Sequence, residues 1–158
     1  MKKWIFFTSV LGFSAYWASN LLLWFPWSYS PSLGITLMLT LTPVLWAYVT
    51  YLALVTYPKM KIMRGAVLIG LIFLILAAGM DYVFFGLIRN AMEDLYHPTT
   101  FYGYGFLVFW PFILALMFKH RIAAEKKETS NKVIFNAGIS GLICFGILTL
   151  IILFGIEI

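Results

Sequence analysis

Residues 65–88 read GAVLIGLIFLILAAGMDYVFFGLI, an apolar stretch in which Asp81 is the only charged residue. A helix needs about 20 mainly apolar residues to cross the hydrocarbon core of a bilayer, and this stretch is long enough. Lipid offers the backbone no hydrogen-bond partner, so a single segment of this kind satisfies its own peptide groups only as a helix. The stretch therefore predicts a transmembrane helix that carries one acidic side chain.

Four more stretches share this apolar character, at residues 4–25, 33–57, 100–118 and 133–156. The connections between the five stretches are rich in proline, serine or charge, at residues 26–32, 59–64, 89–100 and 119–132. The apolar runs are continuous and lack the alternation of a membrane β-barrel. The sequence predicts an all-α membrane protein: a single polytopic domain over residues 1–158, built as a bundle of five transmembrane helices with 119–132 as a long loop.

Composition agrees with this class and excludes others. Hydrophobic residues make up 63% of the chain and charged residues 11%, against roughly 45–50% and 25% in soluble domains. The net charge of +5 would suggest a nucleic-acid partner in a polar protein, but here the basic residues are better explained as topology signals, so we expect no nucleic-acid partner. The single cysteine, Cys144, excludes an internal disulfide and a cysteine-rich metal site.

The positions of the basic residues predict the orientation. All lysines and arginines except Arg89 fall before the first predicted helix, at 59–64 or at 119–132, and these three regions share one side of a five-helix bundle. Because cytoplasmic loops carry an excess of lysine and arginine, we expect a cytoplasmic N-terminus and an extracytoplasmic C-terminus. The localisation that follows is an integral protein of a bacterial-type cytoplasmic membrane.

Polar side chains gather at one predicted depth, near the extracytoplasmic side. Asp81 lies about 25 Å along its helix from Arg64, in the outer part of a core about 30 Å thick. An ionisable residue inside a membrane is costly, so we expect Asp81 to face the bundle interior and bond to a polar group of another helix. Counting along the other helices predicts a shared ligand-binding pocket that includes Asn20, Asp81, Arg89, Tyr102 and Tyr104.

Spacing along the third helix extends this group. Asp81, Phe85, Arg89 and Glu93 follow one another at intervals of four residues, and His97 continues the series. Residues four apart lie on one face of a helix, so Arg89 and Glu93 can form an ion pair. Asp81, Glu93 and His97 are also the candidates for acid–base catalysis.

Two prolines interrupt the predicted helices near their middles, Pro43 in the second and Pro111 in the fourth. Each lacks an N–H group and crowds the carbonyl four residues earlier, which kinks the helix. Such kinks can open a cavity between helices, and they also occur in membrane helices without such a role.

Three functions remain open from the sequence. The first is a protein that binds a small molecule, lipid or ion in the predicted pocket, as a transporter, a sensor or a subunit of a membrane complex. The second is a small membrane enzyme that acts on a lipid headgroup at the outer interface. The third is a structural subunit without a site, in which Asp81 is only a hydrogen-bond partner. An enzyme is less favoured, because no nucleophile–base arrangement is recognisable.

Cofactors and partners follow from what the sequence contains. It has no glycine-rich phosphate loop, no Ser–His–Asp order and no CxxC pattern, so we predict neither a cofactor nor a metal. The partner expected is membrane lipid, and other copies of the chain or a larger membrane complex stay open, because small residues spaced four apart are too common in apolar sequence to establish an oligomer.

Overall fold

The computed structural model describes residues 1–155, apart from the side chains of Trp24, Trp27 and Ser28. Its helices are α1 (Lys2–Tyr29), α2 (Pro31–Val55), α3 (Ile62–Asp81), the π-helix η1 (Tyr82–Ile88), the 3-10 helix η2 (Met92–Tyr96), α4 (Pro98–Met117), α5 (Lys119–Ala124) and α6 (Asn131–Leu153). The predicted end of the last span, residue 156, lies outside the described residues.

Five helical segments in the described chain are long and apolar enough to cross a membrane, which confirms the predicted five-span helical bundle. They are Lys2–Leu23, Pro31–Val55, Ile62–Ile88, Pro98–Met117 and Asn131–Leu153. The third of them joins α3 to η1 without a break.

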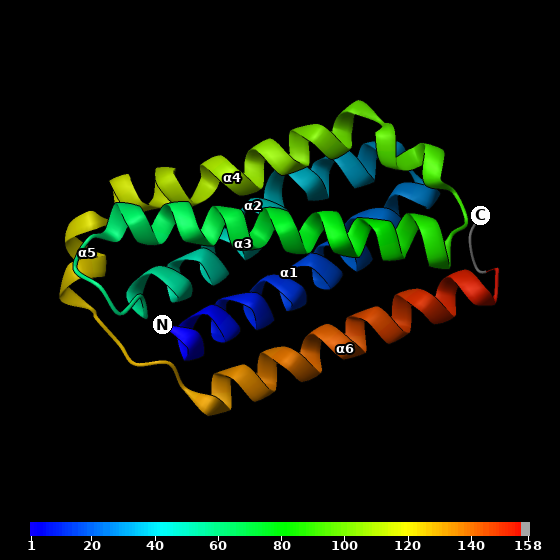
Figure 1. The fold of residues 1–158 in the computed structure, drawn as a ribbon. Coiled ribbons are helices and arrows are strands. Elements are labelled where there is room, and N and C mark those ends of the chain that lie inside the picture. The colour runs from blue at the N-terminus through cyan, green and yellow to red at the C-terminus, as the bar shows by residue number, and fades with distance from the viewer. Residues whose placement is uncertain (156–158) are drawn as a thin grey trace.

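The helices run side by side, with the N-terminus and the end of α6 at opposite ends of the bundle (Figure 1). We call these the N-terminal end, which also carries the α2–α3 turn and α5, and the Asp81 end, which carries the chain between α3 and α4. Helix α1 packs against α2, α3 and α6, while α4 packs mainly against α3. Which end faces the cytoplasm remains a prediction.

Glycines allow the closest helix contacts. A Cβ atom added at Gly70 would lie 3.0 Å from the carbonyl oxygen of Val108, so α3 and α4 approach backbone to backbone. A Cβ atom at Gly141 would lie 2.7 Å from the Phe13 ring and 2.9 Å from the Ser14 Cα, which places α6 directly on α1. Both glycines therefore act within one chain, as small residues do at membrane helix interfaces.

The connection between α1 and α2 is shorter than predicted. We expected a turn over 26–32, but α1 continues through Pro26 to Tyr29 and α2 begins at Pro31. Only Ser30 between them has extended geometry, with φ −155° and ψ 117°. Pro31 fits the first position of α2, because a helix makes no use of the N–H group there.

The predicted loop 119–132 is partly helical and attached to the bundle. It begins as α5, in which Ile122 is fully buried. The Lys127 backbone N–H donates to the Val55 carbonyl over 3.0 Å, and the Tyr51 hydroxyl donates to Glu125 over 2.9 Å. The segment is therefore anchored to the last turns of α2, which charge patterning in the sequence does not reveal.

Candidate functional site

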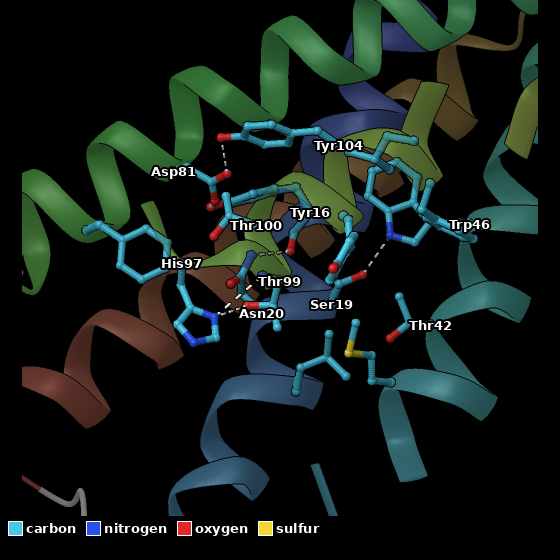
Figure 2. Close-up of a pocket in the computed structure, with 18 of the residues that line it drawn as sticks. Tyr16, Ser19, Asn20, Thr42, Trp46, Asp81, His97, Thr99, Thr100 and Tyr104 are labelled. Atoms are coloured by element: carbon cyan, nitrogen blue, oxygen red, sulfur yellow. Dashed lines mark hydrogen bonds between the residues drawn. The ribbon is translucent and has the colours of Figure 1, made fainter. Parts of the chain in front are cut away.

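A cavity of about 680 Å³ opens between α1, α2, α3 with η1, and α4 at the Asp81 end. Its volume lies within the range of roughly 300–1,000 Å³ that is typical of ligand pockets. Many of its lining residues are drawn in Figure 2. The residues that line it are Tyr16, Ser19, Asn20, Leu23, Met38, Leu39, Thr42, Pro43, Trp46, Ala77, Asp81, Phe85, Arg89, Asp94, His97, Thr99, Thr100, Tyr102, Gly103, Tyr104, Phe106 and Leu107.

Asp81 is the most buried of the charged residues that line the cavity, with 7% of its surface exposed. The Tyr16 hydroxyl on α1 donates to its Oδ1 over 2.5 Å, and the Tyr104 hydroxyl on α4 donates to its Oδ2 over 2.7 Å (Figure 2). The expectation that Asp81 faces the interior and bonds to another helix is confirmed. One carboxyl group thus joins α1, α3 and α4.

Asn20 and Trp46 occupy the wall formed by α1 and α2. The Asn20 side-chain amide donates to the Tyr16 carbonyl of its own helix over 3.0 Å. The Trp46 indole N–H donates to the Ser19 hydroxyl over 3.0 Å, which ties α2 to α1 (Figure 2). Asn20 therefore lines the cavity as predicted, although its amide hydrogen bond goes to Tyr16 and not to Asp81.

Arg89 pairs with Asp94 and not with Glu93, which corrects the predicted ion pair. The guanidinium Nη1 lies 2.9 Å from the Asp94 carboxylate. The register changes because the helix becomes a π-helix at Tyr82–Ile88 and ends there, and Asn90 after it has a positive φ of 51°. A π-helix bonds each N–H to a carbonyl five residues earlier, so residues four apart no longer stack.

The π-helix and the turn after it bring Arg89, Asp94 and His97 to the lining of the cavity. The guanidinium of Arg89 lies 5.6 Å from the centre of the Phe85 ring, within the distance of a cation–π contact. His97 caps α4 through its Nδ1, which accepts from the Thr99 backbone N–H over 3.4 Å. These groups give the cavity a polar rim.

Tyr102 and two of the three acid–base candidates also line the cavity. Tyr102 lines the cavity, although 74% of its surface is exposed. All five predicted ligand-binding residues therefore line one cavity. Of the three acid–base candidates, Asp81 and His97 line it as well, whereas Glu93 is exposed and is not among the described lining residues.

The two mid-helix prolines, Pro43 and Pro111, differ in their relation to the cavity. Pro43 and the preceding-turn residue Leu39 line the cavity. Pro111 is buried inside α4, and Leu107, whose carbonyl it leaves without a helical donor, lines the cavity. Both prolines thus lie in helical turns that contribute to the wall of the cavity. Among residues 1–155, no group of three or more His, Cys, Asp or Glu side chains could hold a metal ion.

Tyr16 was not among the predicted site residues, although it makes the shortest contact to Asp81. It precedes Asn20 by one helical turn, so it lies on the same face of α1. The four-residue spacing from Asn20 was the sequence signal that could have identified Tyr16.

No protein-family model, curated protein or solved structure matches this chain. Its function therefore has to be inferred from the cavity.

Proposed function

We propose that this membrane protein binds a small molecule with a polar group and a largely apolar body in the cavity at the Asp81 end. The observation that carries the proposal is the buried Asp81 carboxyl, held by two tyrosine hydroxyls from other helices on the wall of a cavity of about 680 Å³. We further propose that the protein does so in a bacterial-type cytoplasmic membrane, as a transporter or sensor.

An aspartate inside a membrane span is costly, and this cost supports a functional role for Asp81. An aspartate near the centre of a membrane helix costs about 2.5–3.5 kcal/mol on insertion scales. A hydrogen bond between membrane helices contributes on average about 0.6 kcal/mol. Two such bonds offset less than half of that cost at the membrane centre, and a larger share of the lower cost toward the interface. A carboxyl kept at this cost is expected to have a function.

The remaining walls suit an apolar body. Leu23, Met38, Leu39, Phe106 and Leu107 line the cavity together with the ring of Phe85. The exposed surface of the wall is mainly apolar, and its polar groups converge from several helices, which suits a small-molecule pocket. Asn20, Arg89, Tyr102 and Tyr104 are the polar contacts that we propose beside Asp81.

Filling the cavity tests this proposal. Gly103 lines the cavity, and a Cβ atom added there meets nothing within 4 Å, so Gly103→Phe places a ring in open space. Gly105 has the same freedom on the same helix but is not among the described lining residues, which makes Gly105→Phe the matched control. The probes are 4-phenylbutylamine and 4-phenylbutan-1-ol, which share one apolar body.

Binding would be measured by saturation-transfer NMR on protein in nanodiscs of neutral phosphatidylcholine, with empty nanodiscs as the blank. We expect at least one probe to bind the unaltered protein and Gly105→Phe, and to lose binding in Gly103→Phe. Absence of binding by both probes, or equal binding by both variants, would contradict the proposal.

A further inference from the structure

We propose that the ligand of this cavity is an organic cation, a protonated amine with an apolar body, and that its charged nitrogen binds the Asp81 carboxylate. This inference rests on the proposed function and adds the chemical class of the ligand. It follows from three features of the site: its charge, its hydrogen bonds and its aromatic walls.

The charges that line the cavity do not balance. The described acidic and basic residues of the wall are Asp81, Asp94 and Arg89, which sum to −1 with His97 neutral. Arg89 is paired with Asp94 at 2.9 Å. Neither of the ion pairs found in the described chain includes Asp81. A buried carboxylate is stable when it is paired and hydrogen-bonded, so the place of a cation beside Asp81 is open to a ligand.

The hydrogen bonds around Asp81 suit its ionised form. Tyr16 donates to one carboxyl oxygen and Tyr104 to the other. An ionised carboxylate only accepts hydrogen bonds and has about four lone-pair positions, whereas a protonated one would need an acceptor for its own hydrogen. Two donors leave about two lone-pair positions for a ligand. An ammonium group, which carries only donors, can fill them.

Aromatic residues make up much of the wall around this carboxylate. Tyr16, Trp46, Phe85, Tyr102, Tyr104 and Phe106 line the cavity. The faces of aromatic rings attract cations, most strongly when water is excluded, and aromatic cages recognise ammonium ligands. An anionic ligand would instead meet the negative Asp81 and compete with Asp94 for Arg89.

The test compares three probes that differ only in the polar group: 4-phenylbutylamine, 4-phenylbutan-1-ol and 4-phenylbutanoate. Their dissociation constants would be measured at pH 7 in nanodiscs of neutral phosphatidylcholine, which carry no net surface charge. We expect the amine to bind about tenfold more tightly than the alcohol, because a hydrogen bond to a charged group adds this much or more. The carboxylate should bind most weakly.

Two variants test whether the preference for the amine depends on the charge of Asp81. Asp81→Asn should lower amine affinity about to that of the alcohol while alcohol affinity stays within about threefold, since Asn keeps the shape but removes the charge. Glu93→Gln removes one negative charge from the same end without altering a described lining residue, and should leave the preference intact. The comparison on the unaltered protein remains decisive if Asp81→Asn does not fold.

The outcomes separate the two proposals. An alcohol or carboxylate that binds the unaltered protein as tightly as the amine would overturn the cation assignment and leave the proposed function standing. An amine preference that survives in Asp81→Asn would also overturn it. If none of the three probes binds, or if all bind Gly103→Phe unchanged, the proposed function fails and the inference fails with it.

Discussion

Tyr16 donates its hydroxyl hydrogen to Asp81 over 2.5 Å, although 65 positions separate them in the sequence. Both side chains are buried, with 6% and 7% of their surfaces exposed. The bond joins α1 to α3 next to the cavity, and the bond from Tyr104 adds α4. One carboxyl group therefore links three helices.

This relationship predicts a coupled effect on stability. Tyr16→Phe should destabilise the protein by about 0.6 kcal/mol, and by no more than about 1.7, the range measured for interhelical hydrogen bonds in membranes. In an Asp81→Leu background the same substitution should cost close to nothing, because the acceptor is gone. The measurement is equilibrium unfolding in mixed micelles of the single and double variants, combined as a double-mutant cycle.

Tyr82→Phe is the control for that cycle, because Tyr82 follows Asp81 directly but has 56% of its surface exposed. It should leave stability unchanged. Equal costs of Tyr16→Phe in both backgrounds would show that the bond to Asp81 contributes nothing measurable.

The sequence was sufficient for features that depend on length and hydropathy. The five spans, the interior position of Asp81 and its bond to a polar group of another helix followed from counting residues across a bilayer of known thickness. Tyr16 was missed because depth alone does not show which residues of a helix face share a cavity. The Arg89–Asp94 pair was missed because the π-helix and the positive φ of Asn90 change the register, and neither has a hydropathy signal. The cavity itself depends on how helices pack.

Gly141 and Gly146 on α6 should respond differently to the same substitution. A Cβ atom at Gly141 would lie 2.7 Å from Phe13 and 2.9 Å from the backbone of Ser14, whereas one at Gly146 meets nothing within 4 Å. Gly141→Ala should therefore destabilise the protein by about 1–3 kcal/mol through overpacking. Gly146→Ala should be neutral or stabilising by up to about 1 kcal/mol, because alanine favours helix. Equal unfolding free energies for the two variants would contradict direct contact of α6 with α1.

Glu125 gives a prediction that depends on pH. Arg121 donates to its Oε1 over 2.8 Å and Tyr51 to its Oε2 over 2.9 Å, and these hydrogen bonds hold the pKa of Glu125 below its ordinary value. A lowered carboxyl pKa contributes stability that is present above the unfolded pKa and is lost as pH falls through the folded one. Arg121→Gln should raise the pKa of Glu125 and flatten the stability profile between about pH 5 and 3.

The pKa of Glu125 would be read from a ¹³C NMR titration of labelled glutamate, with Glu125→Gln to assign the signal. Lys119→Gln is the control, because it removes a positive charge from the same helix without removing a hydrogen bond to Glu125. If Arg121→Gln and Lys119→Gln shift the pKa equally, overall charge and not the direct bond sets its value.

Orientation in the membrane is the last prediction, and it follows from the basic residues. The N-terminus, the α2–α3 turn and α5 lie at one end of the bundle, so every lysine and arginine except Arg89 lies at or near that end (Figure 1). This end is expected to be cytoplasmic, because lysine and arginine are retained on that side during insertion.

Cys144 is the only cysteine, so a Cys144→Ala protein can carry one new thiol at Lys127→Cys or at Glu93→Cys, both exposed positions. In intact cells a membrane-impermeant maleimide should label Glu93→Cys and not Lys127→Cys, and after lysis it should label both. Labelling of Lys127→Cys alone in intact cells would invert the orientation and place the cavity on the cytoplasmic side, while labelling of both would contradict the separation of the two ends by a membrane.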